Sequence, residues 1–361
     1  MTLAIAYFVS PHGFGHAARS VAVMEALRAL RPEIRFEIFT TVPAWFFEDS
    51  GVSPVTLYPV LTDIGLVQAS SLDEDLAATV RALDEFLPYA QDRVAELAAT
   101  VRAAGCRLLV TDISPLGLAV AAQAGIPGVL VESFTWDWVY ERYLESEPGL
   151  APFLPLLRQS FDSATVRIQT EPCCQPLVDT TRVRPVSRRF RAKPGEIRSW
   201  LDIAHDRPLA LLTMGGVVWE YEFLDLLEQH PEIVFVVPGG AERWTKRDNL
   251  VLLPHHTPVY HPDLVAAADV VIAKLGYSTL VEAYRAGVPL AYVRRPRLPE
   301  SSALADFAQR HFPCLEISPD DFRAATWLEE LPRLLAADRP PPVETNGANE
   351  IAGHLDTLLG I

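Results

Sequence analysis

The chain has 361 residues, enough for two ordinary domains, and its 49% hydrophobic and 21% charged residues exclude a disordered protein. Its 46 acidic residues against 31 basic ones give a net charge of −15. This argues against a nucleic-acid-binding surface, which needs clustered Lys and Arg, but leaves room for a small anion held by backbone amides and a few cations.

The cysteines and the N-terminus indicate an intracellular protein. Cys106, Cys173, Cys174 and Cys314 lack the spacing of zinc ligands, so free thiols in a reducing cytosol are expected; a redox pair at Cys173 and Cys174 is the alternative. Residues 3–9 are apolar but only one strand long, and no basic segment precedes them, which disfavours a signal peptide. No run reaches the ~20 apolar residues of a membrane span, so a cytoplasmic location is expected.

The first half of the chain alternates apolar runs with helix-length segments. Residues 3–9 predict a strand covered on both faces, followed by a glycine-rich loop and a helix from about Ala17. One face of that helix is apolar, at Val21, Met24, Leu27 and Leu30. Further strands are predicted over residues 34–38, 108–110 and 129–131. Strands that alternate with helices favour a parallel sheet.

The pattern restarts after a stretch rich in Pro and Arg, residues 171–195. Short apolar runs lie at residues 209–212, 233–237, 251–253, 270–273 and 290–293. We therefore predict an α/β protein of two domains, over residues 1–185 and 195–345, with a linker near residues 184–194. A final helix, residues 346–361, has no strand to follow it and is expected to cross back onto the first domain.

An internal echo supports two similar domains. VTDISPLGLAVAAQAGIP in the first half aligns without a gap with IAKLGYSTLVEAYRAGVP in the second, at an offset of 287 − 125 = 162. Gly125 and Gly287 lie where the residue after a helix adopts a left-handed conformation, and Pro127 and Pro289 prevent the helix from continuing. Although any βαβ protein reuses such turns, the gapless match favours two Rossmann-like domains.

The first candidate site is the loop SPHGFGH, residues 10–16, between a strand and a helix. Gly13 and Gly15 allow a tight turn that brings backbone amides close to a ligand. His16 follows the carboxyl end of a strand, where open α/β sheets bind ligands, and imidazole titrates near neutral pH. It is a candidate general base or ligand contact, with a helix-capping or core histidine as the alternative.

The same loop matches the dinucleotide fingerprint G-x-G-x-x-A, with Ala18 as its last position. That fingerprint requires an acidic residue at the end of the second strand, about 20 residues further on. Here the strand ends in Phe39, Thr40 and Thr41. An NAD-dependent oxidoreductase is therefore disfavoured.

The second candidate site is IAKLGYST, residues 272–279, which leads from a strand into a helix. Gly276 allows the turn, so that the following backbone amides point at an anion in front of the helix while Lys274 adds a positive charge. The amides are those of Tyr277, Ser278 and Thr279. The competing interpretation is a capping box formed by Thr279 and Glu282, which accounts for that pair without a ligand.

Three further features of the second half could contact a donor. Gly215 and Gly216 follow a strand and form a turn that approaches phosphates or a sugar, or an ordinary βα turn. Arg294 and Arg295 follow another strand and either neutralise a diphosphate, bind a carboxylated sugar or are solvated. Glu300 either accepts hydrogen bonds from sugar hydroxyls or is a loop charge.

Two acidic residues are alternative bases. Asp112 ends a strand, and Asp137 lies between Trp136 and Trp138, whose rings belong to the core or, as a minority interpretation, stack on an acceptor sugar. The D-x-D sequence of residues 73–75 has the form of a metal-binding motif. It is better explained by acids in the first turn of a helix, so no metal is assigned.

These segments resemble the GT-B glycosyltransferases of family 28, the MurG-like group, and within it the glycosyltransferase-like N-terminal region of plant arabinokinases. The matching motifs are HGFGHAARS, DIGLVQASSLDED, FTWDWVYERY, GYSTLVEA, AGVPLAYVRR and NGANEIAGHL. The resemblance covers most of the chain. The sugar-kinase region of arabinokinases and a P-loop are absent, so kinase activity is not carried over.

The resemblance implies two Rossmann-like domains facing a cleft, with a nucleotide-sugar donor on the C-terminal domain and a hydroxyl acceptor on the N-terminal one. No metal or other cofactor is implied. Gly276, Ser278, Thr279 and Glu282 match the donor-site motif, with Glu282 expected at the ribose, and His16 matches the catalytic-loop histidine.

Two departures leave the donor sugar open. The usual Gly-Gly-Ser-x-Gly loop is Gly-Gly-Val-Val-Trp at residues 215–219, and the usual acidic-Gln pair is Glu300 and Ser301. The expected activity is inverting, metal-independent transfer from a UDP- or dTDP-sugar to a hydroxyl. The alternatives are a nucleotide-sugar 2-epimerase and a non-catalytic regulatory module that binds nucleotide sugars.

Overall fold

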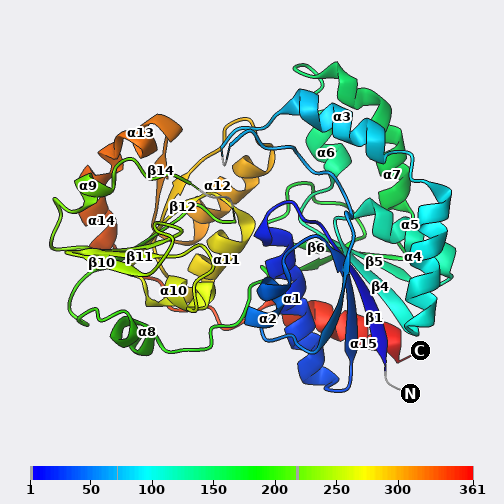
Figure 1. The fold of residues 1–361 in the computed structure, drawn as a ribbon, viewed down its shortest axis with the longest axis horizontal. Coiled ribbons are helices and arrows are strands. Elements are labelled where there is room, and N and C mark those ends of the chain that lie inside the picture. Colours follow the sequence, from blue (N-terminus) through cyan, green and yellow to red (C-terminus); the bar gives the residue numbers. More distant parts are fainter. Residues whose placement is uncertain (1–2, 71, 217–218, 361) are drawn as a thin grey trace. The chain divides into compact units, whose positions relative to one another are not determined.

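The computed structural model describes residues 3–70, 72–216 and 219–360, which form two compact units. Unit 1 comprises the described residues of Met1–Ala69, Glu74–Ser187 and Thr345–Ile361. Unit 2 comprises those of Ser70–Asp73 and Arg188–Glu344. The arrangement of helices and strands along the chain is shown in Figure 1.

Across the described residues, unit 1 contains a seven-stranded parallel sheet in the order β3-β2-β1-β4-β5-β6-β7. Its strands are β1 (Ala4–Val9), β2 (Arg35–Thr40), β3 (Val55–Pro59), β4 (Cys106–Asp112), β5 (Gly128–Glu132), β6 (Val166–Thr170) and β7 (Thr181–Val183). Its helices are α1 (Phe14–Leu30), α2 (Ala44–Asp49), α3 (Leu76–Phe86), α4 (Gln91–Ala103), α5 (Pro115–Ala124), α6 (Trp136–Glu141), η1 (Pro148–Phe153), α7 (Leu154–Asp162) and α15 (Gly347–Leu359).

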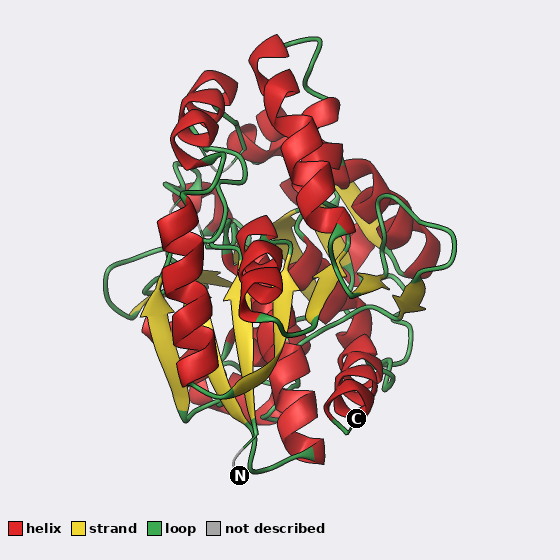
Figure 2. Ribbon diagram, turned by 90° about the vertical axis from the view of Figure 1, so that its right-hand side faces the viewer, coloured by secondary structure: helices red, strands yellow, loops and turns green. Residues whose placement is uncertain are grey.

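Strand β1 shows why a continuous apolar run predicts a central parallel strand. Ile5 and Tyr7 belong to the core on one face of the sheet, and Ala6 and Phe8 belong to the core on the other. Both faces are covered by helices, which Figure 2 shows packed on either side of the yellow strands. Since successive side chains of a strand point to opposite faces, both sets must be apolar.

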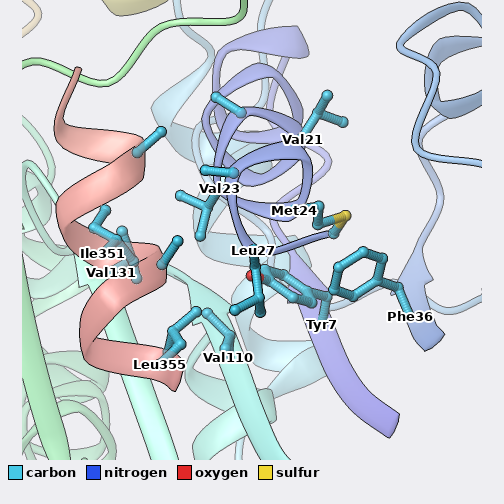
Figure 3. Packing of buried hydrophobic residues seen from close by; sticks show 14 of the residues in the cluster. Tyr7, Val21, Val23, Met24, Leu27, Phe36, Val110, Val131, Ile351 and Leu355 are labelled. Atoms are coloured by element: carbon cyan, nitrogen blue, oxygen red, sulfur yellow. The ribbon is translucent and has the colours of Figure 1, made fainter. Parts of the chain in front are cut away.

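Helix α15 packs against α1, although the two are more than 300 residues apart in the chain. Figure 3 shows Ile351 and Leu355 of α15 beside Val23 and Leu27 of α1. This contact buries a second face of α1, so its apolar surface is wider than the single face expected from the sequence. Two details differ from expectation: α1 begins three residues earlier, at Phe14, and Leu30 is 53% exposed at its end.

Unit 2 also contains seven strands within the described residues, in the order β10-β11-β9-β8-β12-β13-β14, with only β10 antiparallel. They are β8 (Leu209–Thr213), β9 (Val234–Pro238), β10 (Thr245–Arg247), β11 (Leu250–Leu253), β12 (Val270–Lys274), β13 (Leu290–Val293) and β14 (Cys314–Ile317). The helices are α8 (Pro194–Trp200), α9 (Leu224–Leu227), α10 (His261–Ala267), α11 (Tyr277–Ala286), α12 (Glu300–His311), α13 (Pro319–Ala324), η2 (Thr326–Glu329) and α14 (Leu331–Leu335).

The two sheets share the order of their first four parallel strands. In each, the first parallel strand is central, the next two parallel strands extend the sheet to one side, and the fourth begins the other side; unit 2 has the antiparallel β10 as an additional edge strand. The strand order therefore reverses between β1 and β4 in unit 1 and between β8 and β12 in unit 2, and ligands of open α/β sheets bind at such switch points. The echoed turns are confirmed: Gly125 and Gly287 adopt left-handed conformations, with φ of 72° and 64°.

Candidate functional site

At the switch point of unit 1, a histidine meets a carboxylate. Asp112 is the last residue of β4, and His16 lies in the first turn of α1, after Gly13, whose φ of 73° reverses the chain. The Nδ1 atom of His16 is 2.8 Å from Oδ1 of Asp112. Because the carboxylate only accepts hydrogen bonds, Nδ1 donates its proton, which leaves Nε2 as the basic nitrogen.

Arg19 holds the same carboxylate from α1. Its Nε donates to Oδ2 of Asp112 at 2.7 Å, and its Nη2 donates to Oδ1 at 2.6 Å. Both side chains are buried, and Arg19 also donates to Ser133 Oγ. Burial acts to raise the pKa of Asp112, but Arg19 and His16 lower it below its ordinary value. Asp112 is thus an ionised group that orients His16, which favours His16 over Asp112 as a base.

The third candidate base, Asp137, has a different environment. It lies in the first turn of α6, and its Oδ2 is 3.5 Å from Nε of Arg158 on α7. Its neighbour Trp136 approaches His16, with ring centroids 6.3 Å apart, as does Phe134, at 5.9 Å. Trp136 and Trp138 are buried, in accord with the core interpretation.

Asp63 completes this environment and was not singled out from the sequence. Its carboxylate is 2% exposed and accepts hydrogen bonds from Ser10 Oγ at 3.0 Å and Trp136 Nε1 at 3.1 Å. It thereby ties the start of the glycine loop to α6. Burial raises the pKa of Asp63 to about 6. Asp63 is the first residue of the motif DIGLVQASSLDED, and this position was the one sequence feature that could have indicated it.

We expect Asp63→Asn to stabilise the protein at neutral pH. The pKa of Asp63 is higher in the folded protein than in the unfolded chain, so ionisation costs stability as pH rises from about 4 to about 6. Asparagine carries no buried charge, and its Oδ1 accepts from Trp136 Nε1 while its Nδ2 donates to Ser10 Oγ, for a gain of about 1–3 kcal/mol. Thermal unfolding should show the gain at pH 7.5 and its loss near pH 4; an equal change at both pH values would contradict it.

At the switch point of unit 2, helix α11 begins after a glycine. Gly276 is its N-cap residue and, having no side chain, makes no side-chain cap hydrogen bond. The capping-box interpretation is wrong, because Thr279 lies inside the helix as its third residue. The echoed helix α5 differs, since its N-cap residue Ser114 accepts a hydrogen bond from the amide of Gly117 at 3.4 Å.

Lys274 ends β12, two residues before Gly276. Burial, with a further contribution from Arg295, lowers the pKa of Lys274 to about 7, and Glu300, at the start of α12, acts in the opposite direction. Arg294 instead donates to Ser302 Oγ at 3.0 Å and lies 3.5 Å from Glu316. Of the two consecutive arginines, Arg295 is therefore the one whose charge acts on Lys274.

The remaining predicted donor residues lie on neighbouring elements. Gly215 follows β8 with a φ of 77°, so that turn needs a glycine, and Gly216 is half-buried. Val217 and Val218, which carry the departure from the usual loop, lie outside the described residues. Ser278 is half-buried and Tyr277 is buried in the first turn of α11.

Glu282 is enclosed by other side chains. Its Oε1 accepts hydrogen bonds from Arg188, at 3.0 Å from Nε and 2.9 Å from Nη2, and its Oε2 is 3.2 Å from Nδ1 of His261. Burial acts to raise the pKa of Glu282, but Arg188 and His261 lower it. Neither partner was identified from the sequence, because no local pattern links them to residue 282.

The acidic residues of the D-x-D sequence have separate partners. Asp75 is the N-cap residue of α3 and accepts a hydrogen bond from the amide of Ala78, whereas Asp73 accepts one from Arg297. Within the described ranges, no group of three or more His, Cys, Asp or Glu residues is placed to hold a metal ion. None of the described helices combines the length and apolar character that crossing a membrane requires.

No protein-family model matches the sequence. The chain is 28% identical, over an alignment of 372 residues, to L-arabinokinase of Arabidopsis thaliana, with 99% of this chain and 35% of that protein covered. The chain thus spans about a third of the length of this curated relative.

The fold is similar to that of solved glycosyltransferases. Spinosyn forosaminyltransferase SpnP has a TM-score of 0.63 and 16% identity over 100% of both chains. VinC, solved in complex with DTDP, has a TM-score of 0.61 and 18% identity, with 99% of this chain and 100% of that chain covered. MurG of Acinetobacter baumannii has a TM-score of 0.57 and 14% identity, with 98% and 99% covered. The predicted GT-B fold and the arabinokinase resemblance are confirmed.

Proposed function

We propose that this chain, which adopts the GT-B fold, is a metal-independent, inverting glycosyltransferase that moves a sugar from a UDP- or dTDP-sugar to a hydroxyl acceptor. The main observation behind this proposal is a difference between the two units at positions that align in the internal echo. Where unit 1 has Asp112 and the capping side chain of Ser114, unit 2 has Lys274 and Gly276, an N-cap residue without a side chain. The unit 2 site thus suits an anion, and the unit 1 site suits activation of a hydroxyl.

In the proposed reaction, Nε2 of His16 accepts the proton of the acceptor hydroxyl. Asp112 keeps the imidazole in the required tautomer and stabilises its protonated form, while Arg19 fixes the carboxylate. The acceptor oxygen forms a bond to the anomeric carbon as the bond from that carbon to the diphosphate oxygen breaks. The configuration inverts because attack and departure occur on opposite faces.

The donor diphosphate lies in front of α11 in this proposal. The amides of its first turn and the cations Lys274 and Arg295 stabilise the charge that develops on the leaving nucleoside diphosphate. Such a site needs no metal ion, since amide dipoles and cations supply the positive field. The likeness to VinC, which was solved in complex with DTDP, supports a nucleotide as the ligand.

Ligand screening followed by turnover tests the proposal. UDP, dTDP, GDP and their sugars are screened by thermal shift, and nucleoside diphosphate release is then measured with and without alcohols and sugars as acceptors. We expect a shift with a UDP or dTDP ligand and release that depends on an acceptor. Absence of any shift would sink the proposal. Release that no acceptor stimulates would instead indicate an epimerase or a hydrolase, and binding without release a regulatory module.

Lys274 predicts that donor affinity falls as pH rises above about 7. In the free protein the pKa of Lys274 is lowered to about 7, and a bound diphosphate favours the charged amine, so binding above that pH takes up a proton. The affinity for UDP-glucose, whose diphosphate does not titrate in this range, should fall by up to about tenfold per pH unit up to about pH 8.5. Calorimetric titration should show that slope in the wild type and none in Lys274→Met; a flat wild-type profile would contradict it.

A further inference from the structure

Two exposed tryptophans lie side by side in unit 2. Trp200 is 45% exposed at the end of α8, and Trp244 is 39% exposed directly before β10. Their ring centroids are 4.2 Å apart, with 55° between the ring planes. The other large hydrophobic residues exposed within the described ranges are aliphatic. Isolated exposed hydrophobic residues are ordinary, but two touching aromatic rings form a continuous apolar surface.

An ion pair joins the same two segments beside the rings. The ammonium group of Lys246 donates to the backbone oxygen of Asp202 at 2.8 Å and to its Oδ2 at 2.5 Å. Lys246 and Asp202 each lie two residues after one of the tryptophans. The end of α8 and the start of β10 are therefore joined by an aromatic contact and an ionic one. This fixes the rings in place, so little conformational entropy is lost when a ligand packs on them.

The two rings lie at the outer edge of the sheet of unit 2. In the strand order, β10 is the terminal strand, and β11 and β9 separate it from β8. Neighbouring strands lie about 4.8 Å apart, so roughly 14 Å separates β10 from β8, and Lys274 on β12 is one strand further. The tryptophans thus mark a place distinct from the proposed diphosphate site at the switch point.

The size and charge of this surface limit what binds to it. Taking roughly 250 Å² for a whole Trp side chain, the exposed parts of the two rings together offer about 200 Å². A stable protein interface needs about 800 Å² from each partner. The nearby charges are balanced, because Lys246 is paired with Asp202. The exposed Glu242 and Arg243 also have opposite signs. A small, uncharged group with a flat apolar face fits these limits.

We propose that Trp200 and Trp244 form a second ligand site, which binds the pyranose rings of a neutral carbohydrate. One face of a pyranose presents C–H groups that pack on an aromatic ring, while its hydroxyls point outward to hydrogen-bonding groups. Such groups adjoin the rings. Asp202 uses Oδ2 for the ion pair and is 92% exposed, and the side chains of Thr245 and Arg243 are exposed on either side of Trp244. This site goes beyond the proposed glycosyl transfer and does not depend on it.

Ligand-observed NMR tests this site with carbohydrates that carry no nucleotide. The probes are cellotetraose, xylotetraose, mannotetraose and maltotetraose. Trp200→Leu and Trp244→Leu keep an apolar side chain for folding but remove the ring face, whereas Trp200→Phe and Trp244→Phe keep a smaller ring. Leu226→Ala, at a 40% exposed apolar residue of the same unit, is the matched control. Thermal unfolding verifies that each variant is folded.

We expect the wild type to bind at least one tetrasaccharide with a dissociation constant of about 1 mM, and each Leu variant to weaken that binding by about tenfold. The Phe variants should retain part of the affinity, and Leu226→Ala should match the wild type. UDP or dTDP, whichever binds the wild type, should bind all variants equally.

Three results would overturn the carbohydrate site. The first is a wild type that binds none of the probes at up to about 10 mM. The second is unchanged tetrasaccharide affinity in both Leu variants. The third is a Leu variant that loses nucleotide affinity instead, which would assign the ring pair to the donor site. A wild type that binds a tetrasaccharide but no nucleotide would overturn the proposed function alone.

Discussion

Replacement of His16 by alanine is expected to lower glycosyl transfer by about a thousandfold and to leave donor affinity unchanged. General-base catalysis by a positioned imidazole contributes on the order of 10²–10⁴ to a rate. The donor is proposed to bind to unit 2, whereas His16 belongs to unit 1. Single-turnover kinetics with saturating donor measure the chemical step, and calorimetry with the nucleoside diphosphate measures binding.

The orienting role of Asp112 gives a second arm to this experiment. Asp112→Asn removes the charge and can favour the wrong tautomer of His16, so a loss of about 10²–10³ is expected with donor affinity again unchanged. His354→Ala, at an exposed histidine of α15, controls for the loss of a histidine in the same unit. Full single-turnover rate in His16→Ala would show that another group takes the proton.

Arg188→Met is expected to destabilise the protein by about 3–5 kcal/mol, because it leaves the buried carboxylate of Glu282 without its main counter-charge. Arg188→Met combined with Glu282→Leu should recover most of this stability, since both charges of this buried pair are then removed. Arg247→Met is the control: Arg247 is 44% exposed and paired with exposed Asp225, so its loss should cost less than about 1 kcal/mol. Urea unfolding of the four proteins measures the differences.

The pH dependence of this loss follows from the pKa of Glu282. In the wild type that pKa is lowered below its unfolded value, so the pair contributes stability at neutral pH that is lost as pH falls through the folded pKa. Without Arg188, burial dominates and raises the pKa of Glu282. As pH falls, Glu282 becomes protonated, and the variant loses the free-energy cost of a buried carboxylate charge. The deficit of Arg188→Met should therefore shrink below about pH 5; a deficit that is constant with pH would show that lost packing, not charge, is responsible.

Local patterns predicted the centre of each sheet but missed several edges. Strands β1, β4 and β12 are covered on both faces, so each appears as a continuous apolar run. Strands β3 and β10, by contrast, are partly or fully exposed and mix polar with apolar residues. A continuous apolar run indicates a strand that is buried on both faces. Edge strands are incompletely buried, so their sequences lack such a run.

The sequence by itself determined the two-domain α/β architecture, the turns at Gly125 and Gly287, and the contrast between Asp112 and Lys274, because each depends on neighbouring residues or on the internal echo. Only the tertiary structure decided the partners at each site. Arg19 reaches Asp112 across 93 positions of sequence, and Arg188 reaches Glu282 across 94. Ion pairs between such distant residues form only where folding brings their elements together, so no local spacing could reveal them.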